Sequence, residues 1–158
     1  MGIQWMNHTG FVVKNMEKSL AFYCGLLGFI EERNWIREGD YISGITGLKG
    51  ERLHVVYLGI GDMRHSVELL QYLDTPGSKI SPTERNDIGA THLGMIVDDL
   101  DSIYKDLLDK GVKFATPPSD FPNAKYPWAK KGCHCQDPDG NWIEFLERMP
   151  PPSEAEVS

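Results

Sequence analysis

Residues 8–19 read HTGFVVKNMEKS, and residues 92–103 read HLGMIVDDLDSI. When the second stretch is aligned with the first at an offset of 84 positions, three residue types coincide: His8 with His92, Gly10 with Gly94, and Val13 with Val97. The chain has only five histidines, so the coincidence of two of them indicates an internal repeat. The repeat predicts two copies of one small structural module.

Each copy continues into a segment with the apolar spacing of an α-helix. Asn15 in the first copy and Asp98 or Asp99 in the second can cap the first helical turn. The apolar residues at helical spacing are Leu20, Phe22, Tyr23, Leu26 and Leu27 in the first copy, and Ile103, Tyr104, Leu107 and Leu108 in the second. Gly28 and Gly111 follow, and glycine favours the left-handed conformation in which helices often end.

Three strands are predicted after each helix. They span residues 30–37, 53–59 and 65–72 in the first copy, and residues 112–116, 132–136 and 142–147 in the second. The fold class is therefore α+β, with two tandem modules in the order strand, helix and three strands. The predicted layout is one domain at 1–149, made of module one at about 3–73, a connector at 74–87 and module two at about 88–148, followed by a disordered tail at 150–158.

A long loop is predicted within the second module. Residues 116–132 read TPPSDFPNAKYPWAKKG and include four prolines. Structureless loops of this length are usually functional or disordered, so we expect a lid over a ligand pocket. Tyr126 and Trp128 are its large aromatic residues, and they are the candidates for contact with a substrate.

Charge and cysteine content limit the partners. The formal net charge of -7 argues against a nucleic-acid or anionic-membrane surface and favours a small-molecule substrate. Three cysteines, without a recognisable leader, are typical of a reduced cytoplasmic protein. Cys133-His134-Cys135 has no second pair of ligand residues, so we interpret it as part of a strand rather than a zinc site, and His134 as an ordinary histidine.

Two glutamates lie inside apolar strands, in SVELLQY (residues 66–72) and WIEFLE (residues 142–147). A buried ionised carboxylate is very costly without a cationic partner. The repeat places a histidine and a glutamate at equivalent positions of both copies, which are His8, Glu68, His92 and Glu144. Two imidazoles and two carboxylates suit divalent Zn, Ni, Co, Mn or Fe, and an octahedral ion with four protein ligands keeps two positions for substrate oxygens.

These motifs, together with DPDG before the final strand, resemble the vicinal oxygen chelate superfamily, which includes glyoxalase I, methylmalonyl-CoA epimerase, bleomycin resistance proteins and extradiol dioxygenases. The resemblance covers about residues 4–148. It implies two βαβββ modules that form a curled mixed sheet around a metal ion, with His8, Glu68, His92 and Glu144 as the metal ligands. Members of the superfamily often dimerise, so a homodimer is expected.

The resemblance also implies a reaction. We expect a metal-dependent lyase, isomerase or epimerase that removes a proton next to a metal-bound carbonyl through an enediolate, with Glu144 as the base and Glu68 as a second catalytic carboxylate. Val12 and Tyr72 stand where glyoxalase I has the arginine and asparagine that hold glutathione, which places Tyr72 in the substrate site and argues against a glutathione carboxylate.

Two alternatives remain open. An Fe(II) extradiol dioxygenase needs three free metal positions, and Glu68 would occupy one of them. A metal-free drug-binding resistance protein needs none of the four ligands.

Overall fold

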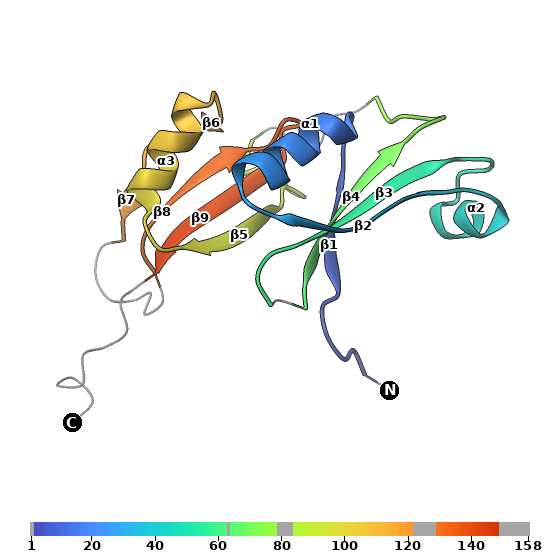
Figure 1. The fold of residues 1–158 in the computed structure, drawn as a ribbon, viewed down its shortest axis with the longest axis horizontal. Helices are drawn as coiled ribbons and strands as arrows, with labels where there is room; N and C mark the ends of the chain where they lie inside the picture. Colours follow the sequence, from blue (N-terminus) through green and yellow to red (C-terminus); the bar gives the residue numbers. More distant parts are fainter. Residues whose placement is uncertain (1, 63, 79–83, 122–128, 149–158) are drawn as a thin grey trace. The chain divides into compact units, whose positions relative to one another are not determined.

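The computed structural model describes residues 2–62, 64–78, 84–121 and 129–148 (Figure 1). The chain forms two compact units, one of residues 1–83 with 138–140 and the other of residues 84–137 with 141–158. Each unit contains one mixed sheet. Among the described residues, no helix is both long enough and apolar enough to span a membrane.

The first unit contains a four-stranded sheet in the order β1-β4-β3-β2. The strands are β1 (His8–Val12), β2 (Ile30–Arg37), β3 (Leu53–Gly59) and β4 (Ser66–Tyr72). The first strand is parallel to the last, whereas the other neighbouring pairs are antiparallel. The three strands predicted after the first helix are therefore confirmed. β3 and β4 are central, and Val55, Leu58 and Leu69 are fully buried there.

The second unit repeats this topology in the order β5-β9-β8-β6. Its strands are β5 (His92–Val97), β6 (Lys113–Phe114), β8 (Ala129–Gln136) and β9 (Trp142–Arg148), and the short β7 (Ser119–Asp120) also pairs with β8. Again the first strand is parallel to the last. β8 begins three residues earlier than predicted, because residues 129–131 extend the ladder with β9. The prediction of a loop at 116–132 is therefore wrong in two places, because β7 and the first residues of β8 are strands.

The two predicted helices are present, and their predicted caps are confirmed. The first consists of α1 (Met16–Leu20) and a π-helical turn, η1 (Ala21–Leu26), and the second is α3 (Leu100–Asp109). Asn15 accepts from the Lys18 amide, and Asp99 accepts from the Ser102 amide. After the helices, Gly28 and Gly111 have φ angles of 77° and 83°, the left-handed conformation expected from the sequence.

The first helix widens where the second stays regular. In η1 the amide of Leu27 donates to the carbonyl of Phe22, five residues earlier. This is the π-helical pattern, which is rare in proteins and usually occupies a single turn. Phe22 and Tyr23 are buried within it, and their rings meet edge to face. The wide turn therefore still presents its aromatic residues to the core.

A side chain of the last strand fixes each helix start. The Met16 amide donates to Oε1 of Gln71 at 3.0 Å, and the Leu100 amide donates to Oε2 of Glu147 at 3.2 Å. Gln71 lies three residues after Glu68 in β4, and Glu147 lies three residues after Glu144 in β9. Because the first amides of a helix have no partner within it, these contacts both satisfy a donor and fix the helix on its sheet.

A third helix was not predicted from the sequence. α2 (Asp40–Thr46) lies between β2 and β3, at the ends of these strands (Figure 1). Its Ile42 is buried and packs with Leu53 and Val55. Tyr57 and Tyr72 pack against the same cluster.

Candidate metal-binding and catalytic site

The register of the parallel strands explains the spacing His-x-Gly in each copy. In β1 and β4, Gly10 lies directly opposite Glu68 and His8 lies opposite Ser66. The histidine and the glutamate are therefore diagonal neighbours on the same face of the sheet, within reach of each other through long side chains. The second unit repeats this arrangement with Gly94 opposite Glu144.

The two glycines leave room for the carboxylates. A Cβ atom added at Gly10 would lie 3.5 Å from Oε2 of Glu68, and one added at Gly94 would lie 3.6 Å from Oε2 of Glu144. Each carboxylate thus lies over the bare backbone of the neighbouring strand. A larger side chain at either glycine would compete with the carboxylate for this space.

The first cluster consists of His8, Tyr57 and Glu68. Nε2 of His8 lies 3.2 Å from Oε2 of Glu68, and Nδ1 lies 2.8 Å from Oδ1 of Asn7. If Nδ1 donates to the asparagine oxygen, Nε2 presents its lone pair to the carboxylate. A lone pair and a carboxylate oxygen repel each other, so a cation or a second ring proton must lie between them. Metal-binding histidines are commonly oriented by such a contact at the other ring nitrogen.

Tyr57 lies directly opposite Glu68 on the third strand. Burial, followed by its hydrogen bond to Glu68, raises the pKa of the Tyr57 hydroxyl. The ring meets His8 edge to face and stacks on Trp35, with centroid distances of 5.5 and 5.8 Å. The hydroxyl therefore stays protonated and donates to the carboxylate, while aromatic neighbours hold the ring.

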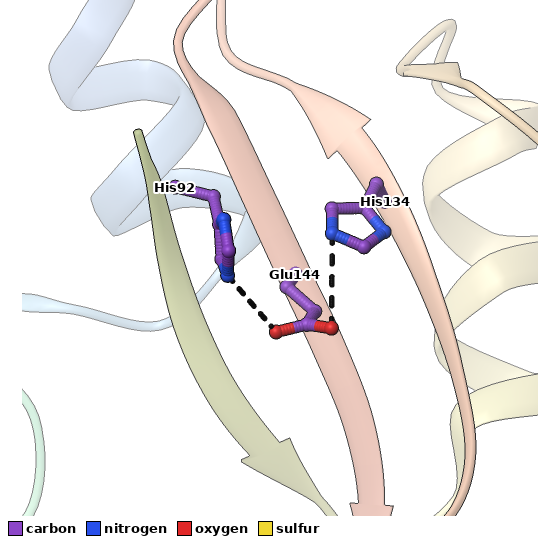
Figure 2. Close-up of side chains that lie close together, drawn as sticks. All are labelled: His92, His134 and Glu144. Atoms are coloured by element: carbon purple, nitrogen blue, oxygen red, sulfur yellow. Dashed lines mark ion pairs between the residues drawn. The ribbon is translucent and has the colours of Figure 1, made fainter. Parts of the chain in front are cut away.

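The second cluster consists of His92, His134 and Glu144, and Figure 2 shows the glutamate between the two imidazoles. Nε2 of His92 lies 3.3 Å from Oε2 of Glu144. Nε2 of His134 lies 3.7 Å from the other carboxylate oxygen, Oε1. The glutamate side chain is 23% exposed here, whereas the Glu68 side chain is 10% exposed. The second carboxylate is thus both flanked by two rings and more accessible.

The electrostatics of the second cluster favour a neutral His134. Burial lowers the pKa of this imidazole, and the positive charge of Arg85 and the nearby His92 act in the same direction, against the opposing effect of Glu144. A neutral imidazole retains a lone pair for a metal ion. On the same strand, burial raises the pKa of the Cys133 thiol to about 11 and of the Cys135 thiol to about 12. Protonated thiols are poor metal ligands, in agreement with the interpretation that these cysteines are structural.

Both clusters have the donor types and spacing that a divalent ion requires. Bonds from zinc to imidazole and carboxylate are about 2.0–2.2 Å, so neighbouring ligand atoms of one ion lie roughly 3.0–3.5 Å apart. The histidine-to-glutamate separations of 3.2 and 3.3 Å fall in this range. His92, His134 and Glu144 each offer an atom within 4.8 Å of the others. The residues therefore fit the predicted metal.

The structure brings the four predicted ligands together as two pairs, each within its own unit. Of the predicted substrate contacts, Tyr72 packs against the cluster around Ile42 and Leu53. Tyr126 and Trp128 lie outside the described residues, as does the predicted disordered tail.

His134 was missed by sequence reasoning, although a signal was present. Strand residues alternate between the two faces of a sheet, and Cys133 and Cys135 are both buried. The histidine between them must face the opposite side, and the antiparallel register places it directly opposite Glu144. The predicted strand contained this information once its pairing with β9 was assumed.

Comparisons with known proteins agree with this architecture. The model of the Glyoxalase/Bleomycin resistance protein/Dioxygenase superfamily matches residues 5–145. The uncharacterized protein YaeR of Escherichia coli is 27% identical over 150 residues, which cover 94% of this chain and 99% of that protein. A probable lactoylglutathione lyase of Synechocystis is 28% identical over 142 residues, covering 89% of this chain and 92% of that protein.

The fold is also similar to that of solved structures. A glyoxalase family protein from Bacillus cereus superposes with a TM-score of 0.83 at 19% identity, covering 95% of this chain and 97% of that one. At this identity the likeness concerns the fold alone. The family match, in contrast, spans most of the sequence and includes both repeats of the strand that carries the histidine. The chain therefore belongs to the Glyoxalase/Bleomycin resistance protein/Dioxygenase superfamily.

Proposed function

We propose that the protein is a divalent-metal-dependent lyase or isomerase that removes a proton from a carbon next to a carbonyl group. In this proposal His8, Glu68, His92 and Glu144 are metal ligands. One observation carries it: at equivalent positions of the two units, an imidazole nitrogen lies 3.2 or 3.3 Å from a carboxylate oxygen. The relative in Synechocystis, named as a probable lactoylglutathione lyase, supports this class of reaction.

A divalent ion in this ligand set supplies Lewis-acid polarisation of a substrate carbonyl, which acidifies the neighbouring C–H bond. Glu144 is the proposed base, because it is the more accessible of the two glutamates. Its carboxylate accepts the proton and returns it to the substrate carbon. General bases of this kind typically contribute 10²–10⁴-fold in rate.

Nε2 of His92 and Nε2 of His134 lie 3.3 and 3.7 Å from the two carboxylate oxygens of Glu144. The two rings flank the carboxylate and limit the positions that it can occupy. Tyr57 donates its hydroxyl to the carboxylate of Glu68. Glu68, the less exposed of the two glutamates, is the proposed permanent ligand.

The first test is metal content. Elemental analysis of the purified chain, loaded separately with Zn, Ni, Co, Mn and Fe, is expected to give stoichiometric binding of at least one of them. His8→Gln and His92→Gln should each lower the metal content. His54→Gln is the matched control, because His54 bonds to Asn34 and belongs to neither cluster. A chain that binds no metal contradicts the proposal and favours a metal-free binding protein. Unchanged metal content in both variants would contradict the assignment of His8 and His92 as ligands.

The second test is the reaction. In deuterium oxide, the lactoyl group of lactoylglutathione should exchange the hydrogen on the carbon next to its carbonyl, as observed by ¹H NMR. A lactoyl thioester of N-acetylcysteamine, which lacks the glutathione carboxylates, should exchange as fast or faster, because Val12 and Tyr72 offer no charge to glutathione. Oxygen consumption with catechol, without exchange in either thioester, would instead indicate a dioxygenase.

We also propose that the protein assembles as a homodimer. Val12 and Ile96 occupy equivalent positions on the first strands of the two units, and they are 56% and 53% exposed. The strands that carry them, β1 and β5, are the first strands of their sheet orders, and an edge strand offers unpaired backbone groups to a second chain. Sedimentation analysis should give the mass of two chains, and Val12→Lys and Ile96→Lys should shift it towards one. A single-chain mass at micromolar concentration contradicts this assignment.

A further inference from the structure

A recess of about 170 Å³ lies beside the second cluster, entirely within the second unit. It is lined by Arg85, Ala90, Thr91, His92, His134 and Trp142. The two histidines are those that flank Glu144. The other four residues have no role in the proposed proton transfer, and their chemistry indicates what the recess accepts.

The recess contains a cation, Arg85. The guanidinium of Arg85 lies over the ring of Trp142, 5.5 Å from its centroid. Within the described part of the chain, Arg85 forms no ion pair. Its five N–H groups suit the planar, two-point recognition of an oxyanion. Its contact with the indole ring fixes the guanidinium at the edge of the recess.

Trp142 adds a donor that has no acceptor. Its Nε1 is buried, and no hydrogen-bond partner for it is present among the described residues. A buried N–H is nearly always satisfied in native proteins, so this donor on a residue that lines the recess is open to an acceptor from outside the described residues. Trp142 begins β9 and lies directly opposite His92, which places the indole next to the second cluster. Thr91, the residue before His92, contributes a hydroxyl to the same lining.

The carboxylate of Glu144 is not part of the lining of this recess. Its two oxygens lie beside the imidazole nitrogens of His92 and His134. The lining offers a guanidinium, a hydroxyl and two imidazoles, with no acidic residue, and includes Trp142, whose indole N–H is buried. This composition matches an anion a few non-hydrogen atoms in size.

We propose that the recess binds an anionic group of the substrate, a carboxylate or a phosphate, through Arg85 and the indole N–H of Trp142. The inference rests on the proposed function in one respect, namely that the anion belongs to the molecule whose carbonyl meets the metal. The substrate class is then a small oxygenated compound with a chelating carbonyl at one end and an anionic group at the other.

The anion site can be tested without a metal. The full chain, labelled with ¹⁵N and without added metal, is titrated with inorganic phosphate and separately with acetate, and the indole N–H resonance of Trp142 is followed. Trp142→Phe identifies that resonance by its loss. The resonance should shift on saturation with at least one anion, and Arg85→Gln should weaken the binding by about tenfold or more. Which of the two anions binds tighter identifies the anionic group.

Arg148→Gln is the matched control, because Arg148 is an exposed arginine at the far end of the same strand. It should leave the titration unchanged. The inference is overturned if neither anion shifts the indole resonance, or if the shift and affinity survive in Arg85→Gln.

A second measurement separates this inference from the proposed function. Calorimetry of the metal-loaded chain compares acetohydroxamate, a chelator, with phosphoglycolohydroxamate, the same chelator carrying a phosphate. The phosphate should increase affinity in the unchanged chain and in Arg148→Gln, and the gain should be lost in Arg85→Gln. If no metal binds while phosphate or acetate still shifts the indole, the proposed function fails and the anion site stands. If both hydroxamates bind equally, the anion site fails and the metal site stands.

Discussion

The two clusters are built on the same backbone and differ at one strand position. In the first unit, the residue opposite the glutamate is Tyr57, and in the second it is His134. Tyr57 donates a hydroxyl to Glu68, whereas His134 faces Glu144 with an imidazole that burial keeps neutral. A hydroxyl donates to Glu68, whereas both oxygens of Glu144 lie beside imidazole nitrogens. The comparison indicates that the two units share a histidine–glutamate pair and differ in the neighbouring strand's residue opposite each glutamate.

The largest expected effect comes from exchanging each glutamate for glutamine. Glu144→Gln should lower the exchange rate by about 10²–10⁴-fold, since it removes the proposed base. Glu68→Gln should act mainly by loss of metal. Rates are measured by deuterium exchange at saturating metal, and metal content by elemental analysis. Glu31→Gln, an exposed glutamate of β2, is the control.

The opposite result, with the metal lost in Glu144→Gln and retained in Glu68→Gln, would contradict these roles. A Glu68→Gln chain with full metal content and no exchange would make Glu68 the base.

A smaller effect is expected from the residues opposite the glutamates. Tyr57→Phe removes the hydroxyl donor of Glu68 and should weaken metal binding by about 10–100-fold, as is usual when a residue that orients a ligand is lost. Isothermal titration with the metal of highest occupancy measures this. Tyr41→Phe, which alters an exposed tyrosine, should have no effect. Equal affinities for Tyr57→Phe and the unchanged chain would show that the hydroxyl plays no part in metal binding.

The smallest effect concerns the helix caps, which differ in charge and in the hydroxyl of Ser102 that donates to Asp99. Asn15→Ala should cost about 1 kcal/mol of stability by urea unfolding, with little dependence on pH. Two hydrogen bonds lower the pKa of the Asp99 carboxyl group: the backbone amide of Ser102 has the larger effect, and the hydroxyl of Ser102 the smaller. A lowered carboxyl pKa contributes stability that is present above the ordinary value near 3.9 and lost as the pH falls through the lower folded value.

The exchange Asp99→Asn sharpens this point, because it gives the second helix the cap of the first. Unfolding of the variant and of the unchanged chain, compared between pH 7 and pH 3, should show a smaller loss of stability in the variant. An identical pH dependence would mean that the cap charge does not matter.

Most of the sheet could be predicted from the sequence because the repeat and the alternation of apolar residues are local signals. β2 and β3 agree with their predicted bounds, and the caps at Asn15 and Asp99 follow from side-chain chemistry. The helix α2 was missed because its seven residues bury one large side chain, Ile42, so that tertiary packing rather than periodicity supports it.

The sequence could predict those residues of the candidate site that occur at the same position in both repeats. His8, Glu68, His92 and Glu144 stand at repeated positions, and the structure brings them together as two pairs. Tyr57 and His134 occupy one structural position but differ in chemistry, so no repeat marks them. Their roles depend on which strands pair and in which register, which is information from the folded chain.

The π-helical turn η1 accommodates one residue more in the first copy than the second copy contains. His8 and Gly28 are 20 positions apart, whereas His92 and Gly111 are 19 positions apart. In a regular α-helix, an inserted residue would rotate all later side chains by about 100°. The π-helical turn absorbs the additional residue locally, so Phe29 remains as buried after the first glycine as Val112 is after the second. A one-residue difference in length between Ala21 and Leu26 is therefore compatible with unchanged positions of His8 and Glu68 in the sheet.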